Sequence, residues 1–89
     1  MPTTPERIRH VLARVQVLLL EKNAAYGDSA LEPVRIFSKA DPLEQLRVRI
    51  DDKLSRVVRG GSEADDVLID LVGYLVLLLV AHQGAERAS

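Results

Sequence analysis

The sequence contains no cysteine and no tryptophan, and only 3% of its 89 residues are aromatic. Without cysteine, the chain has neither a disulfide framework nor a thiolate metal site. A core with so few aromatic rings must be built from leucine, valine, isoleucine and alanine, which is typical of packed helices rather than of a β-sandwich. We therefore expect an all-α protein.

An excess of charge of either sign is also missing. The chain carries 12 lysines and arginines against 13 aspartates and glutamates, for a net charge of −1, so we expect neither nucleic acid nor a membrane as the main partner. The first residues, MPTTPERIRH, lack the apolar core of a signal peptide. The apolar run at residues 67–81 is short for a membrane span and contains Asp70. We expect a cytoplasmic protein with one domain, residues 1–89.

The first helix is predicted to begin at Thr4 and Pro5 and to end near Asn23. Threonine caps a helix well, proline suits its first turn, and apolar residues then recur every three or four positions. Residues 22–41 have neither helical nor strand periodicity, so they predict a long loop between the first and second helices. Such loops are often binding loops, although a plain spacer that returns the chain along the bundle fits equally well.

The second and third helices are predicted to form an antiparallel hairpin. Asp41 caps the second helix, Pro42 takes its first position, and Gly60 ends it with a left-handed residue. Ser62 caps the third helix, which runs to about His82. The third helix is apolar nearly all round, more than two neighbouring helices can cover, so we expect this small three-helix bundle to be completed as a homodimer or homotetramer.

Three carboxylates lie on one stripe of the third helix. Glu63, Asp66 and Asp70 occupy positions i, i+3 and i+7, which share a helical face. The first two belong to the first turn, where acids stabilise the helix dipole, so capping alone explains them. Asp70 lies a full turn further in, among leucines and valines, and it needs a cation or hydrogen-bond donors to stay charged.

Cations and polar side chains gather in two other stretches. Arg49, Lys53 and Arg56 project from one side of the second helix, where pairing with nearby acids is the alternative to binding phosphate. At the start of the predicted long loop, several residues able to contact a nucleotide lie within seven positions, with Asn23 and Tyr26 as candidates for the base or sugar. These residues are Lys22, Asn23, Tyr26 and Asp28.

Three blocks of the sequence together resemble a known family. They are KNAAYGDS (22–29), RIDDKLSR (49–56) and EADDVLIDLVGY (63–74). Their order and spacing resemble the small phage and bacterial proteins of the MazG-like all-α nucleoside triphosphate pyrophosphatase superfamily, especially the branch associated with phage nucleotide metabolism and modification. The resemblance covers most of the chain, residues 20–80.

The resemblance implies an oligomeric enzyme that hydrolyses a nucleoside or deoxynucleoside triphosphate to the monophosphate and pyrophosphate with Mg²⁺. By position, Glu63 and Asp66 match the E-x-x-D element of the metal-binding helix, with Asp70 one turn further on. Asp52, or its neighbour Asp51, stands where the preceding helix contributes its carboxylates.

General chemistry assigns roles to the remaining residues. Magnesium takes carboxylate oxygens and water, so two or three of the acids that the resemblance implies, on adjacent helices, would suffice to hold it. The ion would polarise the phosphate and orient the attacking water, with Asp66 and Asp70 as the catalytic carboxylates that the resemblance implies. Lys53, Arg49 or Arg56 would balance the charge of the leaving pyrophosphate.

The second helix departs from the pattern of the family. Typical members carry E-x-x-E there, whereas this chain has Asp51 and Asp52 followed by Lys53. One alternative is therefore a catalytically inactive nucleotide-binding protein, a regulator or sponge. Another is a helical protein-interaction module of phage origin, in which the third helix is only an interface and its acids only cap it.

Overall fold

The part of the chain that the structure describes forms three helices. The computed structural model describes residues 1–33, 36–60 and 65–88, without the side chains of residues 65–66 and 85–88. No strand occurs in these described residues, so the all-α prediction is confirmed. In chain order the helices are α1 (Thr4–Tyr26), α2 (Pro42–Val58) and α3 (Asp65–Ala88).

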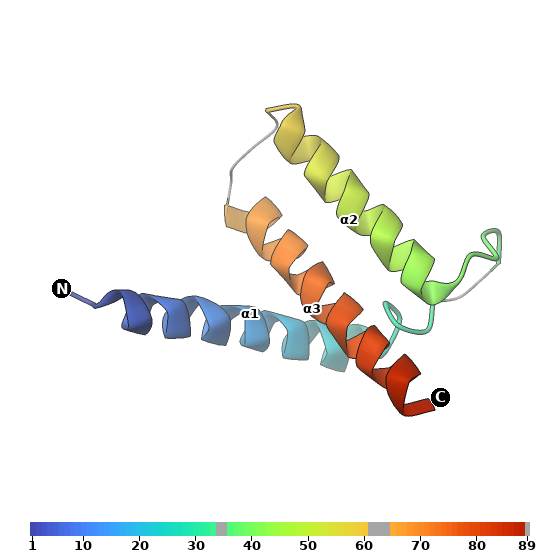
Figure 1. Cartoon of the computed structure of the whole chain (residues 1–89), viewed down its shortest axis with the longest axis horizontal. Coiled ribbons are helices and arrows are strands. Elements are labelled where there is room, and N and C mark those ends of the chain that lie inside the picture. Colours follow the sequence, from blue (N-terminus) through green and yellow to red (C-terminus); the bar gives the residue numbers. More distant parts are fainter. Residues whose placement is uncertain (34–35, 61–64, 89) are drawn as a thin grey trace.

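The helix α1 crosses α3, whereas α2 and α3 pack together antiparallel (Figure 1). The crossing is close because residue 73 is a buried glycine. A Cβ atom on Gly73 would come within 3.2 Å of Cδ2 of Leu19. This distance is shorter than an ordinary van der Waals contact between carbon atoms, so a side chain at this position would require the Leu19 side chain to shift.

The cap of α1 differs from the predicted one by one residue. Thr3, not Thr4, is the capping residue: its hydroxyl accepts from the N–H of Glu6 at 3.3 Å, and its own N–H donates to the Glu6 carboxylate at 3.1 Å. This reciprocal arrangement requires a glutamate three residues after the cap, and only Thr3 has one.

The helix α1 ends at Tyr26, later than the predicted end near Asn23. A lysine and two alanines in residues 22–25 favour the helix. Gly27, with φ of 64°, then ends it, and its N–H donates to the carbonyl of Asn23 at 2.7 Å. As a result Lys22, Asn23 and Tyr26 stand on the last turns of a helix instead of in a loop. The connection to α2 begins only at Gly27.

The helix α2 begins as predicted. The carboxylate of Asp41 accepts from the N–H of Leu43 at 2.8 Å, and Pro42 is the first helical residue. Leu46 and Ile50, 1% and 8% exposed, are the buried residues of this helix. Gly60 follows the end of α2 with φ of 74°, so the predicted left-handed glycine is confirmed. The predicted cap of α3, Ser62, lies outside the described residues.

The helix α3 continues to Ala88, past the predicted end near His82. With this length, Val67–Gly84 is long and apolar enough to cross a membrane by length and composition alone, with a mean hydropathy of 1.9. Core helices of soluble proteins can pass the same test when they are mostly buried, whereas only 6% of this stretch is buried within the single chain. The stretch also packs against α2, and its Asp70 forms ion pairs with lysines. Charged side chains of this kind are costly in the hydrocarbon core of a membrane.

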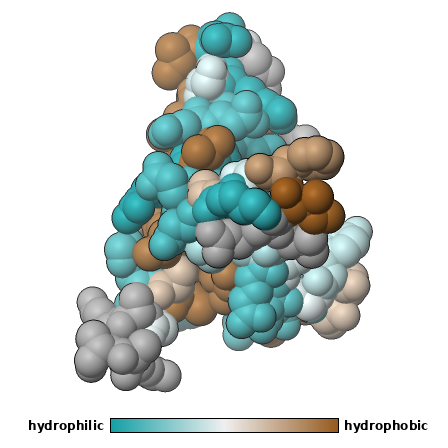
Figure 2. Space-filling model, turned by 90° about the vertical axis from the view of Figure 1, so that its right-hand side faces the viewer, coloured by the Kyte–Doolittle hydropathy of each residue, from teal (hydrophilic) through white to brown (hydrophobic). Residues whose placement is uncertain are grey.

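Few apolar side chains are buried within the single chain. Among the described residues these are Val15, Leu46 and Ile50. Apolar side chains are exposed on all three helices, and Figure 2 shows apolar patches interrupting a hydrophilic surface. Exposed apolar surface of this kind is typical of proteins that bind a partner. On α3 the exposed large apolar residues are Leu68, Val72, Leu75, Leu79 and Val80.

Candidate functional site

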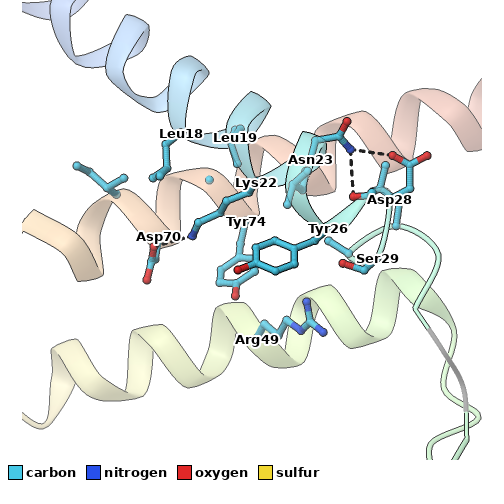
Figure 3. A pocket seen from close by; sticks show the side chains of 16 residues that line it. Leu18, Leu19, Lys22, Asn23, Tyr26, Asp28, Ser29, Arg49, Asp70 and Tyr74 are labelled. Carbon is cyan, nitrogen blue, oxygen red and sulfur yellow. Dashed lines mark hydrogen bonds and ion pairs between the residues drawn. The ribbon is translucent and has the colours of Figure 1, made fainter.

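A hollow of about 230 Å³ lies where α1 crosses α3 (Figure 3). It is lined by the last turns of α1, the turn after Gly27, the middle of α3 and one residue of α2. Its apolar lining includes Leu18, Leu19, Ile69 and Leu77. Its polar and aromatic lining residues are Lys22, Asn23, Tyr26, Asp28, Ser29, Arg49, Asp70 and Tyr74.

The carboxylate of Asp70 pairs with a lysine from each of the other two helices. Nζ of Lys53 lies 3.3 Å from Oδ2, and Nζ of Lys22 lies 3.7 Å from Oδ1. The side chains of Lys53, Asp70 and Lys22 are 15%, 32% and 54% exposed. Asp70 was predicted to need a cation, and these two ammonium groups meet that requirement within the chain itself.

Asn23 has a structural role at the rim of the hollow. Its Nδ2 donates to the carboxylate of Asp28 at 2.8 Å and to the carbonyl of Gly27 at 3.2 Å (Figure 3). The carbonyl of Asp28 in turn accepts from the N–H of Leu31 at 2.9 Å. Since its amide N–H groups are engaged in these bonds, Asn23 holds the turn against the end of α1.

Two tyrosines and an arginine line the hollow from three different helices. Tyr26, at the end of α1, is 73% exposed, whereas Tyr74 of α3 is half-buried. Arg49 reaches the hollow from α2 (Figure 3). Aromatic faces and guanidinium groups both stack on planar ligands, so this rim can hold a flat, polar molecule such as a nucleobase.

Three of the described site residues do not line the hollow. Lys53 contacts Asp70 from α2 but is not part of the lining. Arg56 pairs with Asp52 at 3.3 Å on the surface of α2, where their side chains are 57% and 60% exposed, and neither lines the hollow. This placement agrees with the helical spacing, since Asp52 lies two residues from the buried Ile50 and so faces away from it. Of the other predicted metal ligands, Glu63 and the side chain of Asp66 lie outside the described residues.

The described residues hold no group of three or more histidine, aspartate or glutamate side chains placed to bind a metal. A Mg²⁺ ion does not need such a group, because it is usually bound by one or two carboxylates, by water and by substrate phosphates. Asp70 lines the hollow, but it could take part in such binding only after Lys22 or Lys53 leaves its carboxylate.

Tyr74 is a lining residue that was not predicted as part of the site. It stands four residues after Asp70, so the two share a face of α3. Helical spacing in the sequence places Tyr74 and Gly73 on the stripe of Asp70. That this stripe faces α1 depends on the packing of the helices and is not given by the spacing.

No protein-family model, curated protein or solved structure matches the chain. The resemblance to the MazG-like superfamily therefore rests on the three sequence blocks.

Replacing Asp70 by asparagine should destabilise the fold. Lys53, only 15% exposed, would lose its carboxylate partner, so we expect the free energy of unfolding to fall by about 1–3 kcal/mol. Asp52→Asn is the matched control, because its pair with Arg56 is exposed and should contribute less than about 1 kcal/mol. Urea unfolding followed by circular dichroism measures both, and equal effects of the two substitutions would contradict the structural role of Asp70.

Proposed function

We propose that the protein binds a nucleoside triphosphate in the hollow at the crossing of α1 and α3 and hydrolyses it, with Mg²⁺, to the monophosphate and pyrophosphate. One observation carries the proposal: a single hollow gathers six of the residues predicted to form the site, drawn from all three sequence blocks. These residues are Lys22, Asn23, Tyr26, Asp28, Arg49 and Asp70.

The chemistry of the hollow suits the two ends of a nucleotide. Tyr26, Tyr74 and Arg49 offer planar groups on which a base can stack. Lys22 lines the hollow and offers an ammonium group for phosphate oxygens, on the side where Asp70 lies. Lys53 does not line the hollow, but its ammonium group lies beside Asp70. We therefore orient the base toward the tyrosines and the phosphates toward the lysines.

The two lysines would exchange partners when the substrate binds. In the free protein Lys22 and Lys53 neutralise Asp70. A triphosphate carries more negative charge than one carboxylate, so it would draw both ammonium groups toward itself and leave the oxygens of Asp70 available.

Asp70 is the described residue that would hold Mg²⁺, together with phosphate oxygens. Glu63, Asp66 and Asp52 remain further candidates from the resemblance. When bound, the ion supplies charge neutralisation at the phosphates and orients a water for in-line attack. Lys53, beside Asp70, would balance the negative charge that develops where the bond to the leaving pyrophosphate breaks.

Nucleotide binding without turnover is the second candidate function. The observation in its favour is that Asp70 has its charge balanced by Lys22 and Lys53 without a metal. The residues lining the hollow would then bind the nucleotide in the same orientation, and the protein would act as a regulator or sponge.

Incubation with ribo- and deoxyribonucleoside triphosphates and Mg²⁺ should release pyrophosphate. Asp70→Asn should slow the release at least about 100-fold, because the substitution removes the charge that holds the metal. Glu44→Gln is the control: Glu44 pairs with Arg47 outside the hollow, so its loss should leave the rate unchanged. Circular dichroism shows whether each variant is folded.

The outcomes of this assay separate the candidates when calorimetry is run alongside it. Binding of a triphosphate without release would contradict the enzyme and support the sponge. If the protein neither binds a triphosphate nor releases pyrophosphate, the result contradicts both candidates and leaves the interaction module.

We also propose that the chain forms a homodimer or homotetramer through α3. Its exposed apolar residues include a set spaced by four, three and four positions, which is the spacing of the seam between two packed helices. This seam consists of Leu68, Val72, Leu75 and Leu79. Since it leaves Asp70 and Tyr74 on another side of the helix, assembly and the hollow are compatible.

A charge in the middle of the seam should dissociate the oligomer. Leu75→Glu should give a monomer at micromolar concentration, because a carboxylate in an apolar interface would be desolvated without a partner. Val58→Glu, which makes the same change at an 85% exposed position of α2, should leave the assembly intact. Sizing with light scattering measures both, and a wild-type monomer would contradict the proposal.

A further inference from the structure

A second hollow, of about 410 Å³, adjoins the first on the side toward the amino terminus of α1. The two hollows share Leu18, Lys22, Ile69 and Asp70. The ion pair of Lys22 with Asp70 therefore stands at the boundary between them. The other residues lining the second hollow are Arg14, Val17 and Glu21.

The size of the first hollow indicates that a nucleoside triphosphate would extend beyond it. Sites for small molecules usually enclose about 300–1,000 Å³, and the first hollow has about 230 Å³. With its base against the tyrosines, the nucleotide would reach Lys22 and Asp70 with its first phosphate. The remaining phosphates would then enter the second hollow.

Two cations line the second hollow, Lys22 and Arg14. Arg14 would exchange the interaction that it makes in the free protein for phosphate oxygens. It stands eight positions before Lys22 on α1, so the two lie on one face of the helix about 12 Å apart along its axis. Both have long side chains that can converge on one polyphosphate, and a guanidinium group can bind phosphate oxygens in pairs.

Glu21 also lines the second hollow and carries a negative charge. A bare polyphosphate would be repelled by Glu21 and Asp70. A polyphosphate that carries Mg²⁺ would be repelled less, because the cation would lie between the phosphate oxygens and the carboxylate oxygens. The mixture of cations and carboxylates in this hollow therefore suits the magnesium form of the ligand.

We propose that the second hollow holds the β- and γ-phosphates of the nucleotide, and that Arg14 thereby distinguishes a triphosphate from a monophosphate. This inference rests on the proposed function, because it takes the first hollow as the site of the nucleoside. It assigns Arg14 and the second hollow to the pyrophosphate that hydrolysis would release.

Calorimetry with a nucleoside triphosphate, the matching monophosphate and inorganic pyrophosphate, each with Mg²⁺, tests the inference. Arg14→Gln should weaken binding of the triphosphate and of pyrophosphate about tenfold, the size expected for one lost charge-assisted hydrogen bond. Binding of the monophosphate should not change. Arg14→Lys should restore part of the loss, since it keeps the charge.

Arg9→Gln is the matched control, because Arg9 is an exposed arginine of α1 that lines neither hollow. It should leave all three affinities unchanged. If wild-type protein binds the triphosphate and Arg14→Gln binds it as tightly, the inference is wrong and the proposed function stands. Equal losses for triphosphate and monophosphate would also overturn the inference. If the wild-type protein binds no nucleotide, the inference and the proposed function are both wrong.

Discussion

The ion pairs of Asp70 join the three helices of this protein at one point. A carboxylate in the apolar part of α3 is costly unless cations lie beside it. Lys53 of α2 and Lys22 of α1 meet this need, at 3.3 and 3.7 Å. The pairs therefore favour the arrangement in which α2 and α1 both approach the same part of α3. The same approach encloses the hollow, so the charge that constrains the fold lies at the candidate site.

Close packing at Gly73 complements this electrostatic constraint. The glycine lies three residues after Asp70 and lets Leu19 of α1 approach α3 closely. One turn of α3 thus carries the carboxylate, the glycine at the crossing and Tyr74 in the wall of the hollow. By contrast, the apolar seam of α3 remains exposed in the single chain. The side of α3 that forms the hollow is therefore distinct from the side that we propose for assembly.

Much of the fold could be predicted from local sequence signals. The shortage of aromatic residues and the apolar periodicity predict helices, and Asp41 with Pro42 fixes the start of α2 because capping depends on neighbouring residues alone. The ends of α1 and α3 were harder to predict. At both, apolar periodicity stops before the helix does, and residues such as Ala24 and Ala25 continue a helix without marking a face.

The candidate site was predictable in composition but not in geometry. Lys22, Arg49 and Asp70 were identified from their types and from the resemblance, and one hollow contains them. The pairing of Lys53 with Asp70, and the separate pair of Asp52 with Arg56, depend on how α2 rotates against α3. The hydrogen bonds of Asn23 depend on where α1 ends. Short sequence patterns do not encode these relations between elements.

Nuclear magnetic resonance of the ¹⁵N-labelled protein, titrated with a nucleoside triphosphate and Mg²⁺, tests most directly whether the crossing of α1 and α3 is the nucleotide site. The amide signals of Asn23, Gly27 and Tyr74 should shift in proportion to saturation, whereas those of Ala40 and Gly84, away from the hollow, should stay in place. Shifts confined to other parts of the chain, or no shifts at all, would contradict a nucleotide site at this crossing.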